Sequence, residues 1–152
     1  MSDKLKVLFL CTGNSCRSQM AEGWVRALKS EEIEPYSAGV EVKPVDPLAV
    51  KAMAEVGIDI SAQEPKDLGV YDDEEFDLVI TVCDGAKQSC PMFLGARENV
   101  HWSLEDPAEA EGTEEERMVV FRGIRDEIRR RVEHLIETGE ALNDEGEPVQ
   151  IG

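Results

Sequence analysis

The stretch that decides the fold runs Cys11-Thr12-Gly13-Asn14-Ser15-Cys16-Arg17-Ser18. It follows the apolar run Val7-Leu8-Phe9-Leu10, and it precedes a stretch that places Met20, Ala21, Trp24 and Leu28 on one helical face. A cysteine therefore stands where a buried strand passes into a helix. In such a turn, the N–H groups of a Gly-containing loop and the helix N-terminus converge on one point, which is a binding site for a tetrahedral anion.

Two side chains supply the chemistry of this loop. Arg17 carries a planar guanidinium that can hold two oxygens of an anion at once. The same positive field stabilises a thiolate at Cys11, which makes this cysteine a nucleophile at neutral pH. Ser18 is the expected N-cap of the helix, and its hydroxyl is able to donate to the Cys11 thiolate. The residues expected to bind the oxyanion are Thr12, Gly13, Asn14, Ser15, Cys16, Arg17 and Ser18.

A simpler interpretation of this loop exists. A cysteine after a strand is usually a small core residue, and a cysteine spaced five residues from an arginine occurs by chance in many proteins. Strand, glycine loop, arginine and helix nevertheless occur together within about 25 residues, and this context favours the anion site. The spacing of Cys16 from Cys11 predicts no chemistry, so we interpret the Cys16 side chain as a packing residue.

Composition narrows the class of protein. The chain has 152 residues, enough for one domain with a single core, and a net charge of −17. This charge makes nucleic acid and anionic membranes improbable partners, and it also repels an anionic substrate. The apolar run at 7–10 is too short for a signal peptide or a spanning helix, and the four cysteines then indicate a reducing compartment. We expect a cytoplasmic monomer.

Strands and helices alternate along the chain without an internal repeat. Strands are expected at 6–10, 33–38, 77–82 and 100–102. Helices are expected at 18–28, from Asp46-Pro47 to Gly57, and after the capping box Thr113-x-x-Glu116. Val56 is expected on the inner side of the second helix. The alternation predicts a flavodoxin-like three-layer sandwich with a four-stranded parallel sheet, helices on both faces, and ligands at the carboxyl ends of the strands.

The domain limits follow from the last helix. One domain is expected to span 1–139. Residues 140–152 are acidic and Gly-containing, and they are expected to form a loosely attached tail.

Two further cysteines follow the third expected strand. Cys83 ends that strand and should lie at the same sheet edge as Cys11, and Cys90 comes seven residues later. The spacings do not match the closely spaced ligand pairs of a zinc site, so no metal is predicted. Two unrelated core cysteines remain an alternative. Three thiols at one edge would permit successive thiol–disulfide exchange, which a simple phosphatase does not need.

The loop and several other segments resemble a known family. A cysteine, five residues and an arginine form the loop of the cysteine-dependent phosphatases, and Asn14 and Ser18 make it similar to the low-molecular-weight phosphatases. The chain from about Lys6 to Gly139 resembles the thioredoxin-coupled arsenate reductases more closely still. The segments that carry this resemblance are 11–24, Tyr36-Ser37-Ala38-Gly39, Thr81-Val82-Cys83, Cys90-Pro91-Met92, His101-Trp102 and Asp106-Pro107-Ala108.

The resemblance implies a reduction of arsenate to arsenite without a cofactor. Cys11 would attack arsenic while Arg17 and the loop amides bind the oxyanion, and Asp106 would protonate the leaving oxygen. Cys83 would then attack Cys11, and Cys90 would displace Cys11 by pairing with Cys83. Thioredoxin would reduce the resulting disulfide. From the residues alone, Asp106-Pro107 is equally well an ordinary turn before a helix.

One departure concerns a cation site. Members of the family that bind potassium use an Asn, a Glu, a Ser and an Asp, which Asn14, Glu22 and Ser37 match in part. Lys66 stands where the Asp would be, so we predict no required metal.

Two other functions compete with arsenate reduction. A low-molecular-weight protein tyrosine phosphatase uses the same loop and acid, but it usually has aromatic residues after its Asp-Pro, where this chain has Ala108-Glu109-Ala110-Glu111. A non-catalytic oxyanion or redox sensor that signals through Cys83 and Cys90 is the second.

Overall fold

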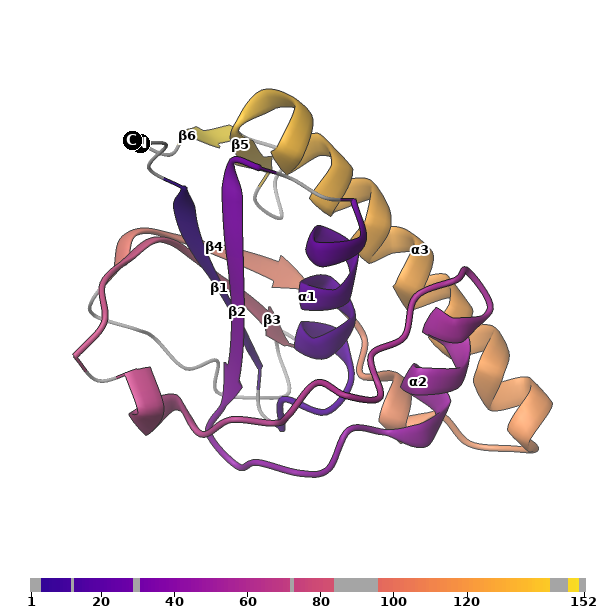
Figure 1. Cartoon of the computed structure of the whole chain (residues 1–152). Coiled ribbons are helices and arrows are strands. Elements are labelled where there is room, and N and C mark those ends of the chain that lie inside the picture. Colours follow the sequence, from indigo (N-terminus) through magenta and orange to yellow (C-terminus); the bar gives the residue numbers. More distant parts are fainter. Residues whose placement is uncertain are drawn as a thin grey trace.

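Four parallel strands form the centre of the fold in the computed structural model, which describes residues 4–11, 13–28, 31–71, 73–83, 96–142 and 148–150 (Figure 1). They are β1 (Leu5–Cys11), β2 (Ile33–Gly39), β3 (Phe76–Cys83) and β4 (Ala96–Ser103), in the order β2-β1-β3-β4. The expected flavodoxin-like parallel sheet is confirmed.

The strand register determines where a ligand can bind. Cys11 pairs with Gly39, and Leu10 pairs with Thr81 on the other side of β1. The carboxyl ends of β1, β2 and β3 therefore meet at one edge of the sheet, where ligands of such folds bind.

Within the described residues, three α-helices and two 3-10 helices accompany the sheet: α1 (Arg17–Ala27), α2 (Pro47–Ala54), η1 (Leu68–Tyr71), η3 (Pro107–Glu109) and α3 (Glu114–Thr138). Figure 1 shows α1 between the sheet and the long α3, with α2 beside the first half of α3. The predicted starts of α2 and α3 are confirmed. Asp46 accepts from the Leu48 N–H, and Thr113 and Glu116 form both bonds of the capping box. None of the helices in the described ranges is long and apolar enough to cross a membrane.

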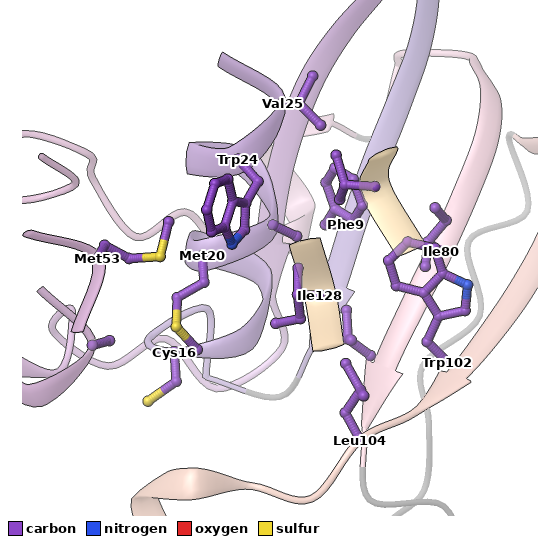
Figure 2. Close-up of a cluster of buried hydrophobic side chains, with 14 of the residues drawn as sticks. Phe9, Cys16, Met20, Trp24, Val25, Met53, Ile80, Trp102, Leu104 and Ile128 are labelled. Atoms are coloured by element: carbon purple, nitrogen blue, oxygen red, sulfur yellow. The ribbon is translucent and has the colours of Figure 1, made fainter. Parts of the chain in front are cut away.

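The main core lies between the sheet and the three α-helices (Figure 2). Phe9 and Trp102 are fully buried there, with ring centroids 6.1 Å apart. Trp24 packs from α1 and donates its indole N–H to the Arg125 carbonyl of α3 at 3.1 Å. Because the only polar atom of the Trp24 ring is satisfied, this large side chain can be buried without a desolvation penalty.

A second, smaller core covers the opposite face of the sheet. Tyr36, Tyr71 and Phe76 form an edge-to-face cluster with ring centroids 5.3 to 5.6 Å apart. Leu8 and Leu10 point to this side, whereas Val7 and Phe9 point to the helices. Both faces of β1 are therefore buried, which explains its uninterrupted apolar sequence.

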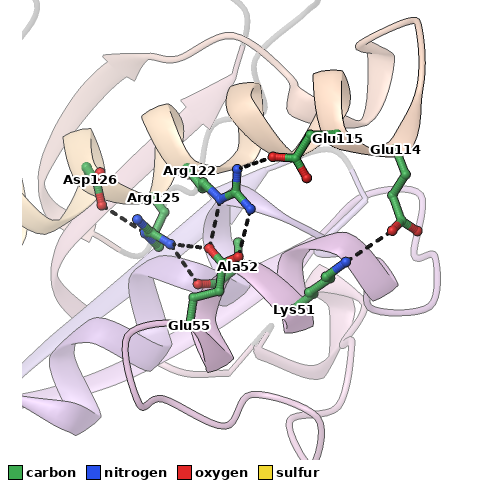
Figure 3. A network of polar contacts seen from close by, with 8 residues as sticks. All are labelled: Lys51, Ala52, Glu55, Glu114, Glu115, Arg122, Arg125 and Asp126. Atoms are coloured by element: carbon green, nitrogen blue, oxygen red, sulfur yellow. Dashed lines mark hydrogen bonds and ion pairs between the residues drawn. The ribbon is translucent and has the colours of Figure 1, made fainter.

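Charged side chains join α2 to α3 on the surface (Figure 3). Arg122 donates to both oxygens of Glu55 at 2.9 and 2.8 Å, and Arg125 donates to Glu55 at 3.1 Å and to the Ala52 carbonyl at 2.9 Å. The hydrogen bonds from Arg122 lower the pKa of Glu55 to about 2. The network consequently stays ionised down to strongly acidic pH.

Two local expectations were wrong. α1 begins one residue earlier than predicted, at Arg17, with Cys16 and not Ser18 at the N-cap. The Ser18 hydroxyl is used elsewhere, as described below. α2 ends at Ala54, so Val56 lies beyond the helix and is 37% exposed instead of lining the core.

The residues after Gly139 differ from the expected loose tail. β5 (Glu140–Leu142) pairs antiparallel with β6 (Pro148–Gln150), and Ala141 is fully buried in the main core. Gly139 caps α3 with a left-handed φ of 73°, which turns the chain back so that β5 packs against α3. Composition does not reveal this contact because it depends on the position of a distant helix face.

Gly23 tests how tightly α1 packs. A Cβ at this position would lie 2.7 Å from Cγ2 of the fully buried Ile60. Gly23→Ala should lower the free energy of unfolding by about 1–3 kcal/mol through overpacking, although alanine is the better helix former. Gly123, in α3, has open space around the same position. Gly123→Ala is the control and should stabilise by up to about 1 kcal/mol in urea unfolding. A gain in stability from both variants would contradict the packing.

Candidate active site

A pocket of about 320 Å³ opens at the carboxyl edge of the sheet. Its walls come from the loop after β1, the loop after β2 and the start of η3. The lining residues are Cys11, Gly13, Ser15, Cys16, Arg17, Glu41, Lys43, Asp106, Ala108 and Glu109. Segments about 100 residues apart in the chain thus meet around the end of β1.

Cys11 lies at the base of this pocket and is 2% exposed. Its Sγ lies 2.8 Å from the Ser18 Oγ and accepts from the Asn14 backbone N–H at 3.2 Å. The Asn14 side chain donates to the same Ser18 oxygen at 2.8 Å. The Ser18 oxygen accepts from Asn14, which leaves its proton available for Cys11. Ser18 and Asn14 are therefore both placed to donate to the Cys11 sulfur.

Asn14 shapes the loop itself. It is fully buried and has a φ of 51°, in the left-handed region that asparagine tolerates better than most residues. Its Oδ1 accepts from the Gln19 Nε2 at 3.1 Å and from the Lys66 backbone N–H at 2.8 Å. These two donors identify Oδ1 and Nδ2, so the amide orientation toward Ser18 is determined by the network.

Arg17 is buried beside Cys11, with 3% exposed surface. One terminal nitrogen donates to the Leu104 carbonyl at 2.9 Å, and the other lies 3.6 Å from Asp106 Oδ2. The Nε–H is buried and has no partner among the described residues. An unpaired buried donor is costly, and an oxygen of an anion in the pocket would satisfy it. The Nε–H and a neighbouring terminal N–H of a guanidinium can also bind two oxygens of an anion in a bidentate manner.

The structure places Asp106 both in a turn before a helix and at the pocket, the two alternatives that the sequence left open. It begins the Asp-Pro turn and caps η3, because Oδ1 accepts from the Ala108 N–H at 3.0 Å. It also lines the pocket, with Oδ2 near Arg17. A carboxyl group held by one oxygen keeps the other for a substrate.

Cys16 belongs to the pocket wall and to the core at once. It is 3% exposed and lies beside Met20 in Figure 2. Burial raises the pKa of its thiol to about 12, so Cys16 stays protonated at neutral pH. This agrees with a packing role for its side chain.

The other predicted residues are placed as follows. Gly13 and Ser15 line the pocket, whereas Asn14 and Ser18 lie behind Cys11. Cys83 ends β3, where its backbone pairs with Ser103 at the sheet edge next to β1. Thr12 and Cys90 lie outside the described residues.

Sequence reasoning missed the loop after β2. Glu41 and Lys43 line the pocket because the Lys43 N–H donates to the Gly13 carbonyl at 3.0 Å and the Asp46 N–H donates to the Ser15 carbonyl at 3.0 Å. Backbone bonds of this kind leave no side-chain signal. The position of the loop directly after a strand at the ligand edge was the one available clue.

The side-chain oxygens suggested as potassium ligands already form hydrogen bonds with other groups of the protein. Glu22 accepts from Ser37 at 2.6 Å and from Arg26 at 2.9 Å, and both Asn14 Oδ1 contacts are N–H groups. The Lys66 ammonium donates to the Glu64 carbonyl. With Arg26 neutralising Glu22, these residues do not fit a cation.

A family comparison agrees with this geometry. Residues 6–147 match the model of the low molecular weight phosphotyrosine protein phosphatases. The chain belongs to this family. Among its relatives, the arsenate reductase of Halalkalibacterium halodurans is 50% identical over 137 residues, which cover 90% of this chain and 99% of that protein.

Two solved structures extend the comparison. An arsenate reductase in the phosphate binding state aligns with a TM-score of 0.75 at 38% identity, covering 88% of this chain and 97% of that chain. A thioredoxin-dependent arsenate reductase of Corynebacterium glutamicum aligns with a TM-score of 0.67 at 30% identity, covering 90% of this chain and 62% of that chain. The family therefore includes oxyanion reductases as well as phosphatases.

The unpaired Nε–H predicts how Arg17 binds anions. Inorganic phosphate should raise the melting temperature of the reduced protein, since any ligand of the native state does so. Arg17→Lys should lose most of this shift, because an ammonium cannot reproduce two parallel contacts. Thermal unfolding with and without phosphate measures it. An unchanged shift in the lysine variant would place the anion elsewhere.

The Ser18 hydroxyl should support the nucleophile. Ser18→Ala removes a hydrogen bond worth about 1–1.5 kcal/mol and should slow alkylation of Cys11 by iodoacetamide at neutral pH by about 5- to 10-fold. Peptide mass mapping identifies the alkylated residue. Ser15→Ala is the matched control, because the Ser15 Oγ bonds to the Cys16 sulfur, at 3.5 Å, and to no other side chain that the structure describes. Equal rates in the two variants would exclude the contact as a source of reactivity.

Proposed function

We propose that this protein reduces arsenate to arsenite by a relay of cysteine thiols. The observation that carries the proposal is the arrangement of Cys11, Arg17 and Asp106 around one pocket, with the cysteine sulfur held by Ser18 and Asn14. Arsenate has nearly the shape and charge of phosphate, so a phosphatase loop suits it equally well. The 50% identity to a protein named arsenate reductase supports arsenate, rather than a phosphate ester, as the substrate.

The first step joins arsenic to sulfur. The Cys11 thiolate attacks As(V), and one arsenic–oxygen bond breaks as a new sulfur–arsenic bond forms. The leaving oxygen takes a proton from Asp106 and departs as water. Arg17 and the loop amides hold the remaining oxygens and stabilise their negative charge. Arsenic is still in the As(V) oxidation state after this step.

The second step carries the reduction. The Cys83 thiolate attacks the sulfur of Cys11, so a disulfide forms and the sulfur–arsenic bond breaks. The electron pair of that bond stays on arsenic, which leaves as As(III). Water attack at arsenic would instead return As(V). A second thiol is therefore what separates a reductase from a phosphatase on this loop.

The third step restores Cys11. The Cys90 thiolate attacks Cys83, which releases the Cys11 thiolate and leaves a Cys83–Cys90 disulfide. A dithiol reductant then supplies two electrons. We propose thioredoxin for this role, as the name of the Corynebacterium glutamicum protein indicates for that enzyme. Such a cycle needs a reducing compartment, so we propose that the protein acts in the cytoplasm. We also propose that it acts as a monomer.

The rim of the pocket favours a small inorganic anion over phosphotyrosine. The residues after Asp106-Pro107 that line it are Ala108 and Glu109, and no aromatic side chain lines the pocket in the part of the chain that the structure describes. A phosphotyrosine ring would find no partner for stacking there and would meet the Glu109 carboxylate. A free arsenate ion needs no such partner.

The test is arsenate-dependent consumption of NADPH with thioredoxin and thioredoxin reductase. Cys11→Ser should abolish arsenate reduction and any hydrolysis of p-nitrophenyl phosphate, since both start at the same thiolate. Cys83→Ala and Cys90→Ala should each stop multiple-turnover reduction while leaving phosphate ester hydrolysis intact.

Peptide mass mapping after one arsenate turnover provides the control. A Cys83–Cys90 disulfide is expected. A Cys11–Cys16 disulfide with Cys83 and Cys90 still reduced would contradict the relay. Rapid ester hydrolysis without arsenate reduction would favour a tyrosine phosphatase, and anion binding without either activity would favour a sensor.

A further inference from the structure

The charge around the pocket opposes its proposed ligand. Among the described residues, three carboxylates line it, from Glu41, Asp106 and Glu109, against two cations, Arg17 and Lys43. The whole chain adds a net charge of −17. An oxyanion with two negative charges therefore approaches against a repulsive field, and each available cation at the mouth matters.

Arg17 is already engaged with the protein. One of its terminal nitrogens donates to Leu104, and the other lies 3.6 Å from Asp106, which offsets part of its charge. Its side chain is 3% exposed and lies deep in the site. It can hold an anion that has entered but contributes little to attraction at the mouth.

Lys43 differs in both respects. It is exposed, and its ammonium makes no hydrogen bond or ion pair with any residue in the described ranges. Other lysines are engaged: Lys6 with Glu74, Lys51 with Glu114, and Lys66 with the Glu64 carbonyl. Of the two described cations that line the pocket, Lys43 is thus the one whose charge is not paired.

The backbone holds Lys43 in place. Its N–H donates to the Gly13 carbonyl at 3.0 Å, and the same loop is tied at its ends by Gly39 N–H to Lys66 and by Asp46 N–H to Ser15, at 2.9 and 3.0 Å. A Cβ on Gly13 would lie 3.5 Å from Lys43 Cδ, so the aliphatic stem lies across the anion loop. Lys43 lines the pocket, so this stem can carry the ammonium to its mouth, where no described side chain pairs with it.

We propose that Lys43 is a second anion-binding residue, which attracts the oxyanion into the pocket and contacts its outer oxygens. Lys43 then sets the affinity and the salt dependence of binding, whereas Arg17 orients the bound ion for attack. The identity of the anion as arsenate rests on the proposed function, but the electrostatic role holds for any dianion of this shape.

Direct binding of inorganic phosphate to the reduced protein tests the role without relying on turnover. At about 20 mM NaCl, Lys43→Gln should raise the phosphate dissociation constant about five-fold in titration calorimetry. Lys43→Arg should stay within about two-fold of the wild type, because it keeps the charge. Lys51→Gln makes the same change of charge on α2, away from the pocket, and should also stay within about two-fold.

Salt separates attraction from a structural role. At about 1 M NaCl the Debye length falls to about 3 Å, so the ratio between Lys43→Gln and the wild type should approach one. In arsenate turnover, Lys43→Gln should raise KM by a similar factor and leave kcat within about two-fold.

Three results would overturn the proposal. They are equal phosphate affinity of Lys43→Gln and the wild type at low salt, an equal loss in Lys51→Gln, and a loss that persists at high salt or in Lys43→Arg. If the protein binds phosphate in this way but does not reduce arsenate, the proposed function fails and the role of Lys43 stands.

Discussion

The buried side chain of Asn14 holds together the loop on which the rest of the site depends. Its amide nitrogen donates to Ser18, its oxygen accepts from Gln19 and Lys66, and its backbone N–H reaches the Cys11 sulfur. One residue in a left-handed conformation thus links the nucleophile, the first turn of α1 and the segment before η1. A loop held from three directions can present its donors without rearrangement when an anion arrives.

The acidic character of the chain constrains how that site can work. Some surface carboxylates are neutralised locally, as in the network of Glu55 with Arg122 and Arg125 that joins α2 to α3. Compensation is incomplete at the pocket, because its described carboxylates, Glu41, Asp106 and Glu109, outnumber its described cations, Arg17 and Lys43. Among the described residues, the rim has carboxylates and no aromatic ring, which would account both for the proposed preference for a small anion and for weak attraction at long range.

Much of the fold was predictable because its signals are local. The apolar run of β1, the Asp46-Pro47 start of α2 and the Thr113-Glu116 capping box each lie within a few consecutive residues, and the structure contains all of them. The errors came where distant parts compete for the same group. Ser18 was expected to cap α1, but its hydroxyl lies at Cys11 and Asn14. The segment after Gly139 was expected to be loose, but Ala141 packs into the main core.

The sequence by itself determined the anion loop, since a strand, a glycine turn, an arginine and a helix start occur within consecutive residues whose backbone geometry depends on their own order. Only the tertiary structure decided what surrounds that loop. Arg17 donates to the Leu104 carbonyl 87 positions away, Asp106 lies beside the same guanidinium, and Lys43 is placed by a backbone bond to Gly13. These contacts arise from the strand order and from main-chain groups that every residue shares, so no local pattern of side chains records them.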